Sequence, residues 1–250
     1  AAENGATLLE SKKKLISKTY LRNAWYVAAW SDDLVDGQLL ARTIMKQPVV
    51  LYRKADGNVA AILDRCSHRF APLHMGKIVH GDRIQCPYHG LEFDSSGACV
   101  LNPHGAKNIP SRAGVRGFPV LEKHKAIWIW MGEKPPDVSK VPDFGVLDNV
   151  PELYTTKRDK MTIRANYELI IDNLLDLSHT CYLHDGILGN SETVESDITV
   201  EQDGEDVVVG RHASEVTAPG LFAALWPTRP DRVDKFTSMR WMPPSTMRLV

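Results

Sequence analysis

The sequence has few cysteines and no long apolar run. Four cysteines among 250 residues are too few for the disulfide framework that holds small secreted domains together. The longest apolar runs, Ala24–Trp30 and Ala126–Met131, are far too short to span a bilayer. Residues 1–20, a polar and partly helical lead-in, lack the apolar centre of a signal peptide. We therefore expect a cytoplasmic protein that has no membrane partner.

The charge balance argues against a second class of partner. Lys and Arg number 30 and Asp and Glu number 31, which gives a formal net charge of −1, so nothing favours nucleic acid as a partner. The G-x-G-x-x-G fingerprint of dinucleotide-binding proteins is also missing from the sequence. The sequence therefore predicts no dinucleotide site of this kind in the chain.

Between Trp25 and about Met131 the sequence consists of short apolar runs separated by turns. Pairs such as Asp36-Gly37 and Asp56-Gly57 mark these turns. Many short strands at close spacing predict an all-β sandwich or barrel rather than alternating strands and helices. The predicted strands are Trp25–Trp30, Leu39–Met45, Val49–Arg53, Val59–Asp64, Arg83–Cys86, Leu91–Phe93, Ala98–Leu101, Phe118–Leu121 and Ala126–Trp130.

The pattern changes after the proline-rich, polar stretch Gly132–Pro142, where we place a domain boundary. Residues 166–179 predict one long helix with an apolar face, which Asp185-Gly186 would end. The later aromatic residues Phe222, Trp226, Phe236 and Trp241 are expected to pack in the core, and the alternative is that they line a substrate pocket. The other predicted elements are strands at Thr155–Ile163, Thr193–Val200 and Asp206–Arg211, with a hairpin turn at Gln202–Glu205.

Two short motifs point to a metal centre. Cys66-Ser67-His68 is followed further along by Cys86-Pro87-Tyr88-His89, so each motif supplies one cysteine and one histidine. Two thiolates and two imidazoles are the ligand set of a Rieske [2Fe–2S] centre. The alternative is a single zinc ion, although zinc sites more often pair C-x-x-C with H-x-x-x-H. A Rieske centre predicts a protein that transfers single electrons.

A second group of polar residues lies on the predicted long helix. Asp172, Asn173, Asp176 and His179 come from the helix, and His184 follows it. Two histidines with a nearby carboxylate and open positions are what a mononuclear non-haem Fe(II) site requires. The alternative is that both are ordinary histidines, because D-x-x-H-x-x-x-x-H is a loose pattern. The upstream motifs favour iron, because a one-electron carrier needs an acceptor. The remaining histidines are expected to be surface or hydrogen-bonded residues: His74, His80, His104, His124 and His212.

Five stretches of the sequence match one known family. They are Asn23–Ala28 (NAWYVA), Cys66–Leu73 (CSHRFAPL), Gln85–Asp94 (QCPYHGLEFD), Ile127–Trp130 (IWIW) and Asp172–His184 (DNLLDLSHTCYLH). With them the sequence resembles the oxygenase (α) component of Rieske non-haem iron oxygenases, and within that family it is most similar to the dicamba monooxygenase and vanillate O-demethylase subgroups. The resemblance implies an α+β fold, in which an all-β Rieske domain (21–135) precedes a catalytic domain of antiparallel sheet and helices (136–250).

The resemblance also implies the cofactors and their ligands. His179 and His184 would be two of three protein ligands of a mononuclear Fe(II). The third, an Asp or Glu on a later helix, is expected beyond Val250, so we expect the sequence to lack a C-terminal portion. The implied ligands of the [2Fe–2S] cluster are Cys66 and Cys86 on one iron and His68 and His89 on the other.

The same resemblance implies how the protein works. Asp176 would connect a catalytic histidine to the His89 of a neighbouring subunit in a homotrimer, and Asn173 would lie near the catalytic iron. Electrons from NAD(P)H would arrive through a reductase or ferredoxin, and O₂ would be used to monooxygenate an aromatic compound by O-demethylation or hydroxylation. The alternatives are an arene cis-dihydroxylating dioxygenase and a Rieske-type electron carrier with no chemistry of its own.

Overall fold

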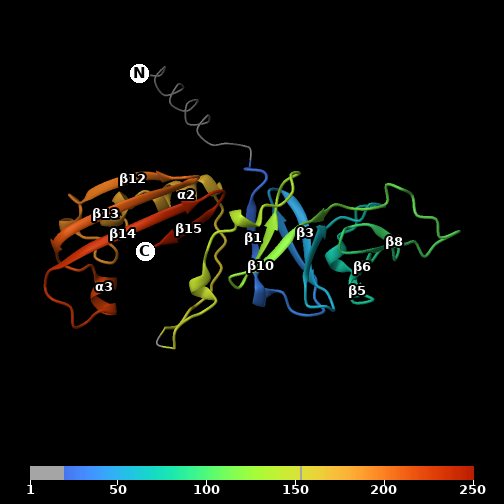
Figure 1. The fold of residues 1–250 in the computed structure, drawn as a ribbon, viewed down its shortest axis with the longest axis horizontal. Helices are drawn as coiled ribbons and strands as arrows, with labels where there is room; N and C mark the ends of the chain where they lie inside the picture. The colour runs from blue at the N-terminus through green and yellow to red at the C-terminus, as the bar shows by residue number, and fades with distance from the viewer. Residues whose placement is uncertain (1–19, 153) are drawn as a thin grey trace, which may run out of the picture. The chain divides into compact units, whose positions relative to one another are not determined.

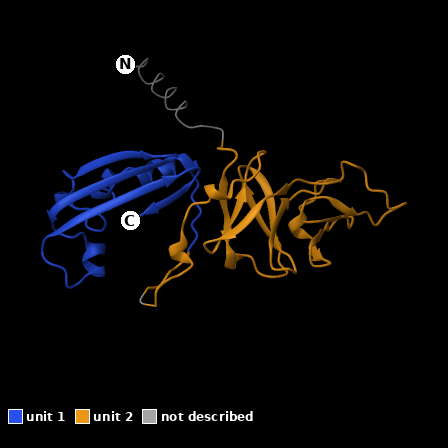
Figure 2. Cartoon of the chain, viewed as in Figure 1, with its two compact units in different colours: residues 1–19, 159–250 blue, residues 20–158 orange. Residues whose placement is uncertain are grey.

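The computed structural model describes residues 20–152 and 154–250, which form two compact units (Figure 2). The N-terminal unit comprises residues 20–158 and the C-terminal unit residues 159–250. The predicted lead-in lies outside the described residues apart from Tyr20. The predicted domain ranges 21–135 and 136–250 stay predictions, and the stretch from 132 to 158 is grouped with the N-terminal unit. No helix among the described residues combines the length and apolar character needed to cross a membrane.

The strands of the N-terminal unit form three antiparallel sheets, as the sequence predicts for an all-β domain (Figure 1). In their order across each sheet, the strands are β1 (Trp25–Trp30), β11 (Ala126–Trp130) and β10 (Val120–Lys123); β2 (Leu40–Ile44), β3 (Gln47–Arg53), β4 (Val59–Leu63) and β9 (Gly117–Phe118); and β5 (Lys77–Val79), β6 (Arg83–Gln85), β7 (Glu92–Phe93) and β8 (Cys99–Leu101). Short 3₁₀ turns lie at Ser31–Asp33, Leu73–Met75, Val138–Lys140 and Gly145–Leu147.

Strand β3 is buried on both faces, which explains its uninterrupted apolar sequence. Val49 and Leu51 on one face share a core with Ile127 of β11. Val50 and Tyr52 on the other face belong to the core that surrounds the two motif cysteines. Since both cores share β3, the loops of the two motifs pack against a strand whose four central residues are fully buried.

Most predicted strands of this unit are confirmed within one or two residues, but one is divided. The predicted strand Phe118–Leu121 becomes β9 and β10, which are separated at Pro119. Proline has no N–H to continue a ladder, although its carbonyl accepts the Trp130 N–H at 2.9 Å. Strand β5 (Lys77–Val79) was not predicted.

The C-terminal unit is an antiparallel meander accompanied by short helices. A turn at Gly204 (φ +64°) joins β12 and β13, which confirms the predicted hairpin. Leu177 contacts Val209 and Met239 in the small core of this unit. The elements are α2 (Tyr167–Leu175), 3₁₀ turns at Leu177–Cys181 and Ser191–Thr193, β12 (Asp197–Asp203), β13 (Asp206–Val216), α3 (Gly220–Leu225), β14 (Val233–Met242) and β15 (Thr246–Leu249).

The predicted long helix is wrong beyond Leu175. There Asp176 leaves the helical conformation (ψ 87°), and its carboxylate accepts the Ser178 N–H at 3.0 Å. Asp is a favoured N-cap because its side chain can satisfy a free N–H in this way. A separate 3₁₀ turn, Leu177–Cys181, therefore begins after Asp176 and carries His179.

Three further predictions for this part of the chain are corrected. No strand forms at Thr155–Ile163, whose residues are all exposed and pair with no strand of the described chain. The strand predicted from Thr193 begins only at Asp197, because an Asn190 capping box starts a 3₁₀ turn at Ser191. Phe222 and Phe236 are 39% and 65% exposed, so they are not core residues.

Candidate functional site

The two motif loops follow the same backbone course. In the first loop, the N–H of Cys66 donates to the carbonyl of Ala71 at 2.9 Å; in the second, the N–H of Cys86 donates to the carbonyl of Leu91 at 2.8 Å. The residue four positions after each cysteine has a positive φ and donates its own N–H back to the carbonyl of that cysteine. The loops are thus structural counterparts that can present equivalent ligands from two sides.

The two cysteines form the buried side of the site. Cys66 and Cys86 are each 2% exposed and lie in the core with Leu73 and Ile84. Burial raises the pKa of the Cys66 thiol to about 11, and the neighbouring Cys86 raises it further. A pair of buried thiols becomes a pair of thiolates only when a cation compensates the charge, which is what a metal centre provides.

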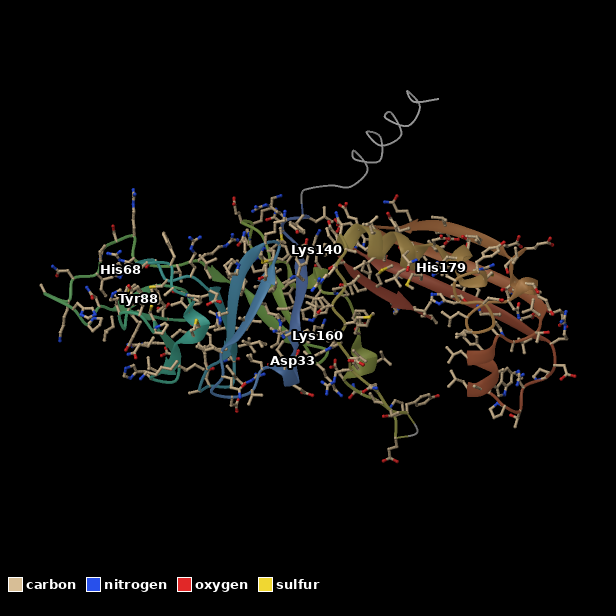
Figure 3. All side chains as sticks on the ribbon, turned by 180° about the vertical axis from the view of Figure 1, so that it is seen from behind. Asp33, His68, Tyr88, Lys140, Lys160 and His179 are labelled. Atoms are coloured by element: carbon tan, nitrogen blue, oxygen red, sulfur yellow. The ribbon has the colours of Figure 1, made fainter. Side chains whose placement is uncertain are left out.

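The two histidines form the outer side of the site. The Nδ1 atoms of His68 and His89 are 3.2 Å apart, and the ring of Tyr88 stacks on that of His89 at 3.9 Å between centroids. Two facing ring nitrogens cannot both carry a proton in this gap, whereas both can direct lone pairs at a shared cation. Figure 3 shows His68 and Tyr88 beside each other in the two loops. The donor set is a buried sulfur pair and an outer nitrogen pair, as the two unlike irons of a Rieske cluster require.

Residues outside the motifs hold these loops in place. The Nε2–H of His104 donates to the carbonyl of His89 at 2.8 Å, and the Ser67 hydroxyl donates to the carbonyl of Ala113. Asp64, which is buried, accepts the backbone N–H of His74 at 2.7 Å and also contacts the His74 ring. His74 and His104 are thus hydrogen-bonded, as the sequence predicts, but their role in bracing the loops was missed because it depends on contacts remote in sequence.

The two histidines of the second predicted group lie together in the C-terminal unit. The rings of His179 and His184 have their centroids 5.3 Å apart. The Nδ1 of His179 lies against the backbone carbonyl of Asp176, which can only accept, so Nδ1 carries the proton. That tautomer leaves the Nε2 lone pair of His179 available for a metal ion. Figure 3 shows where the structure places His179.

The carboxylate of Asp176 is hydrogen-bonded to Ser178 of its own turn and not to a histidine ring. Oδ1 accepts the Ser178 N–H at 3.0 Å and also accepts the Ser178 hydroxyl. These bonds lower the pKa of Asp176, the Ser178 hydroxyl being the largest cause. Among the described residues, no group of three or more His, Cys, Asp or Glu side chains is arranged so that it could hold one metal ion. His179 and His184 therefore lie as a pair, with no third side chain of these kinds beside them among the described residues.

Both histidines line a cavity of about 150 Å³. Asn173 lines it too, so the structure gathers three of the residues that the sequence groups together. Arg211 and Lys235 also line this space. Neither was predicted as a site residue, because a basic residue on a strand normally indicates the solvent face. The remaining lining residues are Leu174, Leu177, Thr180, Leu188, Phe222, Thr237, Met239 and Leu249.

Arg211 fixes the turn that carries His179. Its guanidinium donates to the carbonyl of Leu177 at 2.6 Å, to the hydroxyl of Thr180 at 3.2 Å and to the carbonyl of Thr193. It is only 5% exposed. A buried guanidinium with several acceptors is a rigid connection between the sheet and the histidine turn.

Comparison with known proteins identifies both units. A family model for the Rieske [2Fe-2S] domain matches residues 24–119, and one for the vanillate O-demethylase oxygenase C-terminal domain matches residues 163–250. The oxygenase component of dicamba O-demethylase from Stenotrophomonas maltophilia is 50% identical over 167 residues, which are 66% of this chain and 48% of that protein. The oxygenase component of chloroacetanilide N-alkylformylase from Rhizorhabdus wittichii is 39% identical over 224 residues, 89% of this chain and 63% of that protein.

Solved structures agree with these matches. A crystal structure of dicamba monooxygenase bound to 3,6 dichlorosalicylic acid superposes with a TM-score of 0.84 at 39% identity, covering 92% of this chain and 67% of that one. The chain spans about half to just under two thirds of the length of the two curated relatives above. The chain belongs to the Rieske non-haem iron oxygenases, as the paired motif loops, the histidine pair and these matches together show.

Proposed function

We propose that this protein is the terminal oxygenase component of a multi-component Rieske oxygenase that monooxygenates an aromatic compound, by O-demethylation or hydroxylation. One observation carries the proposal: the chain holds two separate donor groups of different kinds. The N-terminal unit has the cysteine and histidine pairs, and the C-terminal unit has His179 and His184 around a cavity. A protein that only carried electrons would have no use for the second group.

The residues present fit the implied cofactors. The buried thiols of Cys66 and Cys86 would hold one iron of the [2Fe–2S] cluster, and the outer imidazoles of His68 and His89 the other. A mononuclear Fe(II) would be held by His179, whose Nε2 is left free, together with His184. When bound, the cluster supplies single electrons and the mononuclear iron supplies O₂ activation.

The chain's own residues do the remaining work. The core around the cysteines excludes water from the sulfur side, so electrons enter and leave by the histidine side, where His68 is exposed. That side opens on a hollow of about 570 Å³, lined by residues that include Asn102 and Arg112. Electrons from NAD(P)H would reach this face through a separate reductase or ferredoxin.

We further propose that the working unit is a cytoplasmic homotrimer in which Asp176 of one subunit contacts His89 of the next. Asp176 is exposed, and both hydrogen bonds from Ser178 end on its Oδ1, which leaves Oδ2 available for such a contact. A carboxylate that bonds an imidazole sets its tautomer and so couples proton state to redox state.

Iron analysis of the full-length protein tests the proposal. We expect about three irons per chain, a reduced-state EPR signal of the cluster, and NAD(P)H-dependent turnover of a methoxybenzoate with release of formaldehyde when a reductase is supplied. Two irons per chain without turnover would indicate an electron carrier. Zinc without an EPR signal would exclude the cluster, and a cis-dihydrodiol product would replace monooxygenation by dihydroxylation.

A further inference from the structure

We infer that His124 is a pH-dependent clasp: in its protonated form it holds residues 143–148 against the N-terminal unit, and it loosens them when it loses its proton. These residues lie between the two family matches, 24–119 and 163–250, and the proposed function gives them no role. The inference therefore goes beyond that function and does not depend on it.

His124 lies at the tip of the hairpin that joins β10 and β11. Lys123 pairs with Ala126, so His124 and Lys125 form a two-residue turn, and both have a positive φ (56° and 58°), as a type I′ turn requires. Although a hairpin tip usually lies at the surface, His124 is only 6% exposed. The 3₁₀ turn Gly145–Leu147 packs on it, since a Cβ added to Gly145 would lie 3.9 Å from Cε1 of the ring.

Both ring nitrogens of His124 face a carboxylate. Nδ1 lies 2.6 Å from Oδ2 of Asp148, and Nε2 lies 3.4 Å from Oδ1 of Asp143. An ionised carboxylate only accepts hydrogen bonds, and a neutral imidazole has a single N–H to donate. The imidazolium, which has an N–H on each nitrogen, is therefore the form that suits both contacts. In the neutral form one nitrogen lone pair would face a carboxylate.

The contact to Asp143 is the one that depends most on this charge. Nε2 is buried and has no hydrogen-bond partner within the described chain. A buried polar atom of this kind is unfavourable unless a nearby group compensates it. The Asp143 carboxylate compensates Nε2 through charge, and it can do so only while the ring is protonated.

The same two carboxylates belong to the 3₁₀ turn that the clasp holds. Oδ1 of Asp143 accepts the N–H of Gly145 at 2.9 Å, where the turn begins. The N–H of Asp148 donates to the carbonyl of Gly145 at 3.0 Å, where the turn ends. His124 thus binds the turn at both ends, and loss of its proton weakens both ends together.

The other charges around His124 come from its own hairpin and from two neighbouring 3₁₀ turns. The turn Ser31–Asp33 contacts the hairpin, because the N–H of Ser31 donates to the carbonyl of Lys125 at 2.9 Å. Its two aspartates are paired elsewhere, with Arg42 and Arg158. The charged residues on the elements packed around His124 are Lys123, Lys125, Asp32, Asp33, Lys140, Asp143 and Asp148. Asp143 and Asp148 are the carboxylates within ion-pair distance of the ring.

The clasp should therefore weaken as the pH rises. Histidine is the side chain whose charge ordinarily changes between about pH 5 and 8. Below this range the imidazolium provides both contacts, and above it the contacts lose their attraction. The stabilisation of residues 143–148 is thus present at acid pH and is lost toward alkaline pH.

The loosening should stop at the residues that precede Asp143. The indole N–H groups of Trp25 and Trp130 donate to the carbonyls of Asp137 and Lys134 at 2.7 and 2.8 Å, and Val141 packs among these tryptophans. Indoles and backbone carbonyls do not titrate in this range, so residues 134–141 stay held at every pH. The pH response is confined to the part of the segment that follows them.

Hydrogen exchange of the full-length holoenzyme, followed by mass spectrometry at pH 6.0 and 8.5, tests the clasp. Each rate is divided by the intrinsic exchange rate at its pH. The reporters are the amides of residues 147–149, which donate within the 3₁₀ turn, and the internal controls are those of Lys140 and Val141. Protection of residues 147–149 should fall about 10-fold from pH 6.0 to pH 8.5, as expected for the loss of a hydrogen bond to a charged group. Protection of the two controls should change less than about twofold.

Three variants identify the group responsible. His124→Asn keeps the hairpin turn, because asparagine tolerates a positive φ, but removes the charge; protection of residues 147–149 should be low at both pH values. Asp143→Asn, at a side chain that is 89% exposed, lets a neutral Nε2 accept a hydrogen bond, so the pH response should shrink to about threefold or less. His212→Asn replaces an exposed histidine of β13 and should keep the full response.

Four results would overturn the clasp. These are wild-type protection of residues 147–149 that does not change with pH, an equal fall at Lys140 and Val141, a full pH response in His124→Asn, and a full response in Asp143→Asn. If His124→Asn fails to fold, the wild type and Asp143→Asn still decide, because the second changes only an exposed side chain.

Discussion

Replacing Arg211 by methionine should destabilise the C-terminal unit and release the histidine turn. Arg211 is 5% exposed and donates to the carbonyls of Leu177 and Thr193 from β13. Methionine preserves most of the side-chain volume but donates nothing. The sheet would then lose its polar connection to the turn that carries His179, while its apolar packing would largely remain.

The size of the effect follows from these bonds. A hydrogen bond from a charged donor contributes about 1.5–3 kcal/mol, so the two carbonyl bonds together contribute about 3–6 kcal/mol. Both carbonyls keep a hydroxyl donor, from Thr180 and Ser196, so neither is left unpaired. Removing the guanidinium also removes its desolvation penalty, and we therefore expect a net loss of about 2–4 kcal/mol. For a unit of this size that corresponds to a fall in Tm of roughly 8 °C or more.

The assay compares Arg211→Met with Arg240→Met. Arg240 lies in the same sheet and pairs with Asp203 at 2.9 Å and Asp206 at 2.8 Å, but exposed ion pairs of this kind contribute at most about 1 kcal/mol. Thermal unfolding followed by circular dichroism gives Tm, and metal analysis with visible spectroscopy gives iron content. We expect Arg211→Met to lose the mononuclear iron and to keep the visible absorption of the cluster.

A Tm for Arg211→Met equal to that of Arg240→Met would refute the reasoning, because it would mean that the buried bonds contribute no more than exposed ones. Loss of the cluster absorption in Arg211→Met, with the mononuclear iron retained, would contradict the assignment of the two metal groups to separate units.

Three other changes test the rest of the structure. Leu73→Ala empties a fully buried position beside the motif cysteines and should cost about 2–5 kcal/mol, whereas Met75→Ala, 68% exposed in the same turn, should change Tm by less than ~2 °C. Asp176→Asn should leave the cluster reducible by dithionite while turnover falls about 10- to 100-fold, and Asp172→Asn, on the exposed side of α2, is the control; normal turnover in Asp176→Asn would falsify the proposed electron route. Burial raises the pKa of Tyr52, whose hydroxyl donates to the Asp82 carbonyl. The stability that its protonated form contributes is therefore complete below pH ~10, the ordinary pKa of a tyrosine, and declines as the pH rises further. In urea titrations at alkaline pH, Tyr52→Phe should lose less stability than the wild type.

The N-terminal unit was largely predictable because its strands are short, apolar and separated by turn residues. β3 and β11 could be located from uninterrupted apolar runs, since burial on both faces removes the polar alternation. The division at Pro119 shows the limit of this reasoning: an apolar run gives the region of a strand, but a missing N–H decides where pairing stops.

The fold of the C-terminal unit was less predictable from the sequence, because local hydrogen bonds compete there with regular helices and strands. The apolar spacing of residues 166–179 fits a helix, yet the Asp176 carboxylate ends that helix by capping the next turn. A stretch such as Thr155–Ile163 has strand-like composition, but a strand forms only where a neighbour pairs with it. Motif spacing singled out His179 and His184, whereas the turn that carries His179 is held by Arg211, which lies 34 positions after Leu177 in the sequence.

The two metal groups should load independently of each other. The cysteines lie in a core with Leu73, whereas Leu177, beside His179, lies in a different core with Met239. Substitutions at sites that share no partners have additive effects on stability. Leu73→Ala should therefore deplete the cluster and spare the mononuclear iron, whereas Arg211→Met should do the reverse. The double variant should show the sum of both losses, and a double variant that lost more than this sum would indicate that one metal group helps to assemble the other.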